Sequence, residues 1–236
     1  MGLDPEDVVV ISVMPCIAKK YEAANSQRDE RRDVDHVITT RELAKMFKEA
    51  GVDLRHMPDE SFDNPLGESS GAGVIFGATG GVLEAALRTV YEQVTGKELA
   101  DVNFTAVRGM AGVREVSIPL NGHTVNVAAA SGLGNARTIL NKIVRGESHY
   151  DVIEIMACPG GCVNGGGQPF CADRVETIEQ RIKGLYTIDG GQARRKSHEN
   201  PAIHKLYDEY FGEPGSRKAH ELLHVSYEQT YRPHRG

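Results

Sequence analysis

The stretch IEIMACPGGCVNGGGQP, residues 153–169, joins a short apolar run to a loop in which two cysteines are surrounded by glycines. The run is rich in β-branched residues, which is typical of a buried strand. An earlier stretch, ISVMPC at residues 11–16, repeats Ile, a β-branched residue, Met and Cys at matching places. We therefore expect two strands whose carboxyl ends deliver cysteines to the same edge of a sheet, where ligands of parallel sheets collect.

Apolar runs alternate with helical patterns along the rest of the chain. The patterns predict strands at residues 8–13, 34–38, 113–118, 124–130 and 152–156, and helices at residues 17–25, 39–50, 82–94, 135–144 and 175–185. Thr39 and Glu42 form a capping box, and Asn121-Gly122 indicates a hairpin turn. Thr79 is expected to cap the third helix, and the DGGQ at 189–192 to end the fifth.

This alternation predicts an α/β fold, with a mostly parallel sheet flanked by helices and a helical C-terminal tail. We expect two parts, an α/β lobe at residues 1–190 and a tail at residues 191–236, in which two short amphipathic helices lie at about 201–211 and 217–224.

Composition narrows the class of partner. The 236 residues carry a net charge of −6, so no basic surplus exists to bind nucleic acid or an anionic membrane. No apolar run approaches the roughly 20 residues needed to span a bilayer, and the start MGLDPEDVVV lacks the pattern of a signal peptide. We therefore expect a cytoplasmic protein without membrane insertion.

Four cysteines in such a chain favour ligands or reduced thiols over a disulfide framework. Three of them, Cys16, Cys158 and Cys162, are expected to converge, and the glycines at 160–161 and 165–167 lack a Cβ that would keep the backbone away. Backbone N–H groups can then approach an anionic iron–sulfur cluster. Zinc would accept the same thiolates, but structural zinc sites usually pair C-x2-C knuckles and need no glycine run. Incidental reduced cysteines remain the alternative.

Two of these stretches also carry a family resemblance. MPCIAKKYEA, residues 14–23, resembles the second signature of the FeFe hydrogenase catalytic domain, and residues 154–169 resemble the third. Residues 76–89 and 195–224 are similar to that family as well. The resemblance implies an H-cluster, in which a 4Fe-4S cluster is bridged to a two-iron centre with CO, cyanide and azadithiolate ligands. It implies reversible reduction of protons to H₂, a ferredoxin-type electron carrier, and hydrogenase maturation proteins as partners.

The resemblance also implies roles for individual residues. Cys16, Cys158 and Cys162 would hold the 4Fe-4S cluster, with Cys162 as the bridge to the two-iron centre. Lys19 would hydrogen-bond a cyanide ligand, although without the motif it would be read as a solvated lysine. The side chains implied to line the two-iron centre are Met14, Met156 and Phe76, of which the methionines could equally be ordinary core. The residues implied to shape the loop around the cofactor are Gly160, Gly161, Gly166, Gln168 and Pro169.

One part of the family pattern is missing. The first signature, T-S-C-C-P-x-W, is absent, and the chain contains no tryptophan. That region supplies the fourth cluster cysteine and the proton-relay cysteine in the family. The resemblance therefore implies the C-terminal part of the catalytic domain with a fused small-subunit-like tail, partnered by an N-terminal lobe on the same or a separate chain. Whether this part binds a cluster alone stays open, and Cys171 is either a free thiol or a substitute fourth ligand.

Two other functional classes remain. One is a hydrogenase-like protein of cytosolic iron–sulfur assembly that carries clusters without catalysis, and the other is a cluster-free lobe that binds a partner. HELLH at 220–224 fits the zinc-protease pattern H-E-x-x-H, but Tyr227 stands where a related pattern requires glycine. GLGNAR at 132–137 is a partial dinucleotide fingerprint that more often begins a helix. Glu154, on the same strand face as Met156, is a paired buried carboxylate or a loop anchor.

Overall fold

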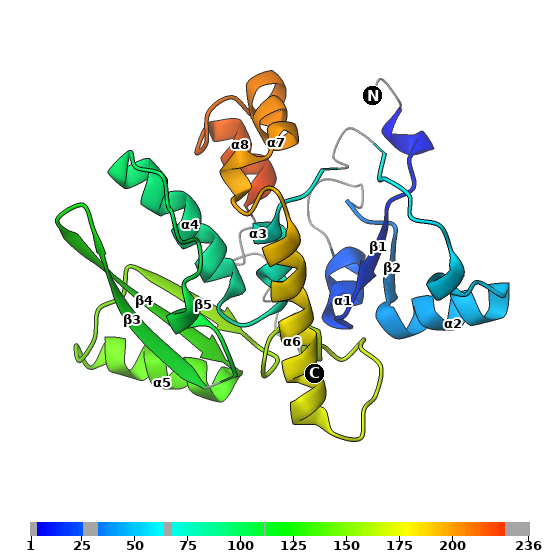
Figure 1. Ribbon diagram of the computed structural model, residues 1–236, viewed down its shortest axis with the longest axis horizontal. Coiled ribbons are helices and arrows are strands. Elements are labelled where there is room, and N and C mark those ends of the chain that lie inside the picture. Colours follow the sequence, from blue (N-terminus) through cyan, green and yellow to red (C-terminus); the bar gives the residue numbers. More distant parts are fainter. Residues whose placement is uncertain (1–3, 26–32, 64–67, 111, 225–236) are drawn as a thin grey trace, which may run out of the picture.

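The computed structural model describes residues 4–25, 33–63, 68–110 and 112–224 (Figure 1). Its strands are β1 (Ile11–Met14), β2 (His36–Thr39), β3 (Val113–Leu120), β4 (His123–Ser131) and β5 (Val152–Met156). Its α-helices are α1 (Ala18–Ala24), α2 (Thr40–Ala50), α3 (Gly71–Val74), α4 (Gly81–Thr95), α5 (Leu133–Val144), α6 (Arg174–Gly191), α7 (Pro201–Leu206) and α8 (Arg217–Leu223). Short 3-10 turns include η3 (Ile75–Gly77) and η5 (Cys162–Asn164), and a π-helix, η7 (Tyr207–Phe211), continues α7.

The described strands form two small sheets, which differs from the single sheet that the sequence suggested. β1 pairs in parallel with β2, while β4 lies between an antiparallel β3 and a parallel β5. The α/β class and the excess of parallel pairings are confirmed. The two strands with matching sequences, β1 and β5, nevertheless belong to different sheets, and α6 runs between these sheets in Figure 1. A repeated pattern predicts strands but does not predict which strands pair.

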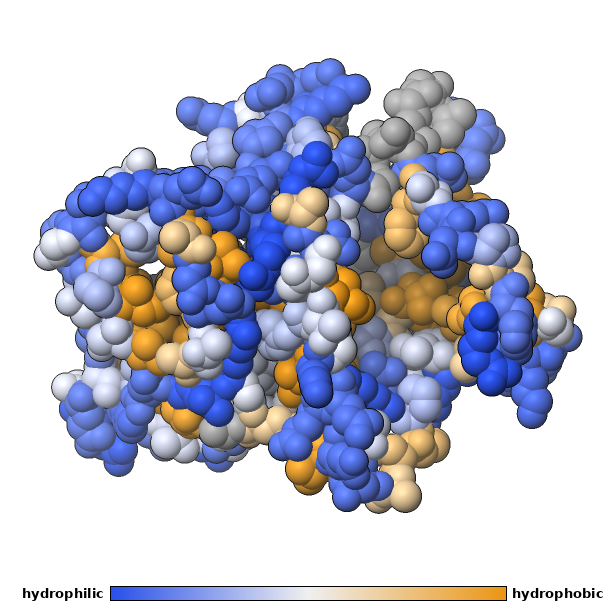
Figure 2. Space-filling view, in the orientation of Figure 1, coloured by the Kyte–Doolittle hydropathy of each residue, from blue (hydrophilic) through white to orange (hydrophobic). Residues whose placement is uncertain are grey.

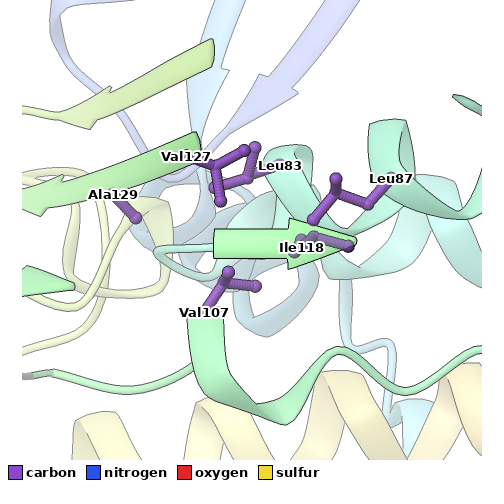
Figure 3. Close-up of a cluster of buried hydrophobic side chains, with 6 residues drawn as sticks. All are labelled: Leu83, Leu87, Val107, Ile118, Val127 and Ala129. Carbon is purple, nitrogen blue, oxygen red and sulfur yellow. The ribbon is translucent and has the colours of Figure 1, made fainter. Parts of the chain in front are cut away.

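The core of the larger sheet has one helix on each face. Val127 and Ala129 of β4 pack in a cluster with Leu83 and Leu87 of α4, which Figure 3 shows together with Val107 and Ile118. The alternate residues, Ala128 and Ala130, pack with Ala136 and Ile139 of α5 instead. Because successive side chains of a strand point to opposite faces, the continuous apolar run of β4 serves both helices.

Local sequence signals placed several elements correctly. The capping box at Thr39 is present, since the Thr39 hydroxyl accepts from the N–H of Glu42 at 3.2 Å and the Glu42 carboxylate accepts from the N–H of Thr39 at 2.7 Å. The β3–β4 hairpin turns at Asn121 and Gly122, whose φ angles are 49° and 85°. The two short helices of the tail and the helix start at residues 132–137 are also confirmed. Among the described residues, no helix is long and apolar enough to cross a membrane.

The start of α4 differs from the prediction because a distant residue caps it. Thr79 makes no capping hydrogen bond, and Gly80, with a φ of 87°, occupies the N-cap position. The carboxylate of Glu154 on β5 accepts instead from the N–H groups of Gly80 at 2.5 Å and Leu83 at 2.8 Å. Burial raises the pKa of Glu154, and these backbone hydrogen bonds oppose the rise. Glu154 therefore anchors the residue 77–81 turn to β5, as one of its two interpretations expected.

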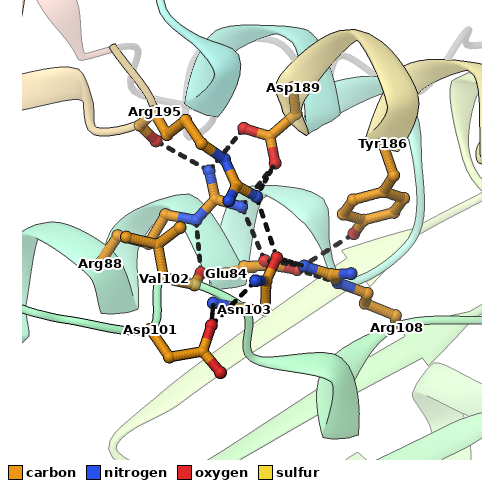
Figure 4. Close-up of polar contacts among 9 residues, drawn as sticks. All are labelled: Glu84, Arg88, Asp101, Val102, Asn103, Arg108, Tyr186, Asp189 and Arg195. Atoms are coloured by element: carbon orange, nitrogen blue, oxygen red, sulfur yellow. Dashed lines mark hydrogen bonds and ion pairs between the residues drawn. The ribbon is translucent and has the colours of Figure 1, made fainter. Parts of the chain in front are cut away.

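A buried ion network joins α4 to α6 and to the segment that follows α6 (Figure 4). The side chains of Glu84, Arg88 and Asp189 are fully buried. Arg88 binds both carboxylate oxygens of Asp189, at 2.8 and 2.9 Å, and Glu84 at 2.8 Å. Arg108 and Arg195 add further ion pairs to Glu84 and Asp189. The DGGQ motif does end α6, at Gly191, but the helix continues past the predicted residue 185 and so includes Asp189, which it presents to this network.

The apolar side chains of β1 and the residues before it are exposed. Val9 and Ile11 are 66% and 58% exposed, and Val8, Val10 and Val13 are exposed as well. In Figure 2, apolar surface lies in the hollow on this side of the molecule. Isolated strands of this composition are normally covered on both faces, so this face is suited to burial against further protein.

Candidate functional site

The loop that follows β5, residues 158–169, is called here the cysteine loop. It begins with a tight turn in which the N–H of Gly161 donates to the carbonyl of Cys158 at 2.9 Å. Gly160 and Gly161 have φ angles of 83° and 99°, a region that residues with a Cβ rarely adopt. The turn places Cys162 at the start of η5, one short turn beyond Cys158. The turn therefore depends on backbone conformations at Gly160 and Gly161 that favour glycine.

Three thiols gather at the ends of β1 and β5. Strand β1 ends at Met14 and β5 ends at Met156, and Cys16 and Cys158 each come two residues after these ends. Both cysteines are half-buried. Partial burial raises the pKa of the Cys162 thiol, the nearby Cys16 and Cys158 raise it further, and Lys19 lowers it. Cys16, Cys158 and Lys19 therefore all lie within electrostatic reach of Cys162, although β1 and β5 belong to separate sheets.

The glycines of the cysteine loop bring it against two other segments. A Cβ at Gly161 would meet the backbone of Gly77 and Thr79 at 2.7 Å, and a Cβ at Gly165 would meet the carbonyl oxygen of Pro15 at 2.1 Å. Gly167 donates its N–H to that same Pro15 carbonyl at 2.9 Å. These glycines thus carry the loop to the end of β1, where Cys16 lies.

Gly166 has more room than its neighbours, because its nearest contact for a Cβ is the Ile17 side chain at 3.4 Å. Gln168 is half-buried and donates its N–H to the carbonyl of Gly165 at 3.0 Å. Gly165 and Gly166, unlike Gly160 and Gly161, do not adopt a positive φ.

The remaining predicted site residues lie on several elements and differ in their exposure to solvent. Lys19 lies on α1 and forms an ion pair with Glu22. Met14 and Met156 end their strands and are half-buried, while Phe76 lies in η3 and is 46% exposed. Cys171 is exposed beyond the loop.

The donor set suits an iron–sulfur cluster better than a single ion. Within the described residues, no group of three or more His, Cys, Asp or Glu side chains is close enough to hold one metal ion. A 4Fe-4S cluster is bound differently, because each thiolate ligates a separate iron and the ligands need not meet at one point. Three gathered thiols beside a glycine-rich loop fit such a cluster, with a fourth ligand still to be supplied.

The zinc-protease pattern does not develop into a site. His220 on α8 and His224, which caps its C-terminal end, contact each other, with Nδ1 atoms 2.6 Å apart, and the Glu221 carboxylate pairs with Arg217. In the zinc proteases that glutamate serves as a base beside the metal. The string instead ends the second short helix that the sequence predicted for the tail.

Sequence reasoning missed several polar supports of the site. The Ser131 hydroxyl, at the end of β4, accepts from the N–H of Gly160 at 2.8 Å. Arg41 and Arg181 bind carbonyls of the cysteine loop. Each support comes from an element more than ten residues away, and a lone Ser or Arg on a strand end or helix gives no local signal of such a contact.

Comparisons with known proteins show the family of this chain. Residues 1–166 match the family model described as "Iron only hydrogenase large subunit, C-terminal domain", and residues 175–230 match "Iron hydrogenase small subunit". The chain belongs to the iron-only hydrogenase family. This hydrogenase-family chain is 50% identical, over 96% of its length, to the NADP-reducing hydrogenase subunit HndD of Solidesulfovibrio fructosivorans, and 46% identical, over 97%, to iron hydrogenase 1 of Clostridium pasteurianum.

Solved structures agree at the level of the fold. The FeFe-hydrogenase HydA(deltaEFG), whose structure concerns stepwise H-cluster assembly, superposes with a TM-score of 0.78 at 45% identity over 96% of this hydrogenase-family chain. The chain spans 39% and 41% of the two curated relatives and 64% of that solved chain. It is also 34% identical, over 95% of its length, to the cytosolic iron–sulfur assembly component 3 of Bos taurus, of which it covers 48%.

Proposed function

We propose that this chain forms the C-terminal part of the catalytic unit of an FeFe hydrogenase, which interconverts protons and H₂ at an H-cluster. The observation that carries the proposal is the gathering of Cys16, Cys158 and Cys162 beside Lys19, at the ends of two separate strands. When bound, the H-cluster supplies electron transfer and the making and breaking of the H–H bond. The chain's own residues bind it, orient it and limit its contact with water.

The proposed roles follow the placement of the side chains. Cys16, Cys158 and Cys162 would hold the 4Fe-4S part, and Cys162 would also serve the two-iron part. Lys19 would donate a charge-assisted hydrogen bond to a cyanide ligand, which would require its ammonium to turn from Glu22 towards the thiols. The apolar wall of the two-iron part consists of Met14, Met156 and Phe76.

The rest of the catalytic unit is proposed to cover the exposed face of β1. The chain spans 64% of the solved HydA chain, so about a third of such a unit lies outside it. That missing portion is the proposed source of the fourth cysteine and of the proton path. A ferredoxin-type carrier is the proposed electron partner, and maturation proteins are proposed to insert the two-iron part. We propose a cytoplasmic location. One relative is a periplasmic hydrogenase large subunit from Nitratidesulfovibrio vulgaris, so subcellular fractionation is needed to test this location.

A second candidate function is cluster transfer without catalysis, favoured by the 34% identity to the assembly component. The two functions differ in how firmly the cluster is held. A hydrogenase unit should retain its cluster when mixed with an apo-ferredoxin, whereas a carrier should give it up. Measuring iron in both proteins after separation distinguishes the two.

The first test of the hydrogenase proposal is iron and acid-labile sulfide content after anaerobic reconstitution, together with the EPR spectrum of the dithionite-reduced protein. The parent chain is expected to show a 4Fe-4S signal, because its three thiols are already gathered. Cys16→Ser is expected to lose most of the iron, and the matched variant Cys171→Ser to keep it. Iron near background in the parent, or equal iron in parent and Cys16→Ser, would contradict the proposed ligand set.

A further inference from the structure

Arg181 of α6 holds the cysteine loop at two points. Its guanidinium donates to the carbonyl oxygen of Val163 at 2.9 Å and to that of Pro169 at 3.1 Å. A planar guanidinium with several fixed donors can make both bonds at once, whereas an ammonium is a single point charge. Arg181 therefore fixes the distance between the cysteine end and the proline end of the loop.

Arg41, at the start of α2, holds the same loop from another element. Its guanidinium donates to the carbonyl oxygen of Gly166 at 3.0 Å, and its backbone N–H donates to that of Gly167 at 3.1 Å. The guanidinium also lies over the Phe170 ring, 4.4 Å from its centroid. The first turn of a helix has N–H groups without partners inside the helix, so the loop also satisfies one donor of α2.

Most other carbonyls of the loop are bound as well. Pro159 accepts from the Asn164 amide at 2.9 Å, Gly160 from the N–H of Thr79 at 3.2 Å, and Cys162 from the N–H of Gly165 at 2.9 Å. The backbone N–H groups of Cys162 and Gly166, in contrast, donate to no acceptor within the described ranges of the chain. Most carbonyl oxygens of the loop, the negative ends of its peptide dipoles, are thus bound by protein donors, whereas the N–H groups of Cys162 and Gly166, which are positive ends, remain available.

An anionic cluster distinguishes between these two kinds of group. Carbonyl oxygens facing the thiolates would repel its charge, while N–H groups facing them stabilise it and raise its reduction potential. The orientation of the loop's peptides therefore matters to a bound cluster beyond the fixing of its ligands.

We propose that Arg41 and Arg181 are positioning residues that turn the carbonyls of the cysteine loop away from the thiols and keep its N–H groups directed towards an anionic iron–sulfur cluster. This inference deepens the proposed function and rests on it. The two arginines come from different helices, and Arg41 binds carbonyls at Gly166 and Gly167, between the two carbonyls that Arg181 binds.

The test compares the parent chain with Arg181→Met and Arg181→Lys, and with Arg145→Met as the matched control. Arg145 follows α5 as its C-cap, is exposed, and pairs only with Glu147 among the ion pairs of the described residues. In the cluster-free chain, hydrogen exchange of residues 158–169 is expected to become about tenfold faster in Arg181→Met, since charged hydrogen bonds are lost. Arg181→Lys is expected to restore this only in part, and Arg145→Met to leave the loop unchanged.

The reconstituted proteins provide the second readout, the reduction potential of the cluster followed by EPR. Arg181→Met is expected to bind iron with a more negative potential than the parent, because fewer N–H dipoles face the cluster. Loop exchange equal to the parent's overturns the positioning role. Faster exchange with an unchanged potential and EPR spectrum reduces Arg181 to a structural contact and also overturns it. Background iron in the parent itself would instead be the failure of the proposed function.

Discussion

Replacing Arg88 by methionine should be among the most damaging single changes in this chain. Arg88 is fully buried, and its five donated hydrogen bonds end on Glu84, on both oxygens of Asp189 and on the carbonyls of Val102 and Arg195. Removing it leaves two buried carboxylates with less compensation and two carbonyls without a partner. Breaking a buried ion pair in this way costs about 3–5 kcal/mol of unfolding free energy. In a chain of this size, that corresponds to a fall in Tm of roughly 6–20 °C.

Thermal and urea unfolding of the cluster-free chain, followed by circular dichroism, measures this loss. The matched control is Arg55→Met, which breaks a bidentate pair with Asp53 on the exposed surface and should shift the transition little. Adding Asp189→Asn to Arg88→Met should recover part of the loss, since it removes a buried charge that then keeps only Arg195 as an ion-pair partner. The reasoning is refuted if Arg88→Met lowers the Tm no more than Arg55→Met does.

Two further predictions concern the loop and the tail. Gly161→Ala should lower the free energy of unfolding by roughly 2–4 kcal/mol, because it places a Cβ 2.7 Å from backbone atoms at a φ of 99°. Gly166→Ala should be tolerated. Equal unfolding midpoints for the two variants would contradict this prediction. Hydrogen bonds from the N–H of Leu99 and from Lys196 lower the pKa of Glu92 from 4.5 to about 2. Its stabilising contribution is therefore complete above pH 4.5 and lost as the pH falls towards 2, so the parent should lose more stability over this range than Glu92→Gln, as urea midpoints would reveal.

The sequence by itself determined the local elements. Strand β5, the β3–β4 hairpin and the capping box of α2 depend on side-chain periodicity, turn residues and contacts between residues at most a few positions apart. The cysteines and glycines of residues 153–169 also predicted the iron–sulfur character of the family, because thiols can ligate a cluster and glycines let backbone N–H groups approach it. These signals are contained within short windows of sequence.

Only the tertiary structure decided how distant side chains meet. It divided the strands between two sheets and still brought Cys16 to Cys158 and Cys162. It capped α4 with Glu154, 74 residues away, and extended α6 by pairing Asp189 with Arg88, 101 residues away. A carboxylate or a guanidinium has no preferred partner in the sequence, since hydrogen bonds and charges act on whatever folding places nearby. For the same reason, only the fold shows that Arg181 binds the carbonyls of the cysteine loop.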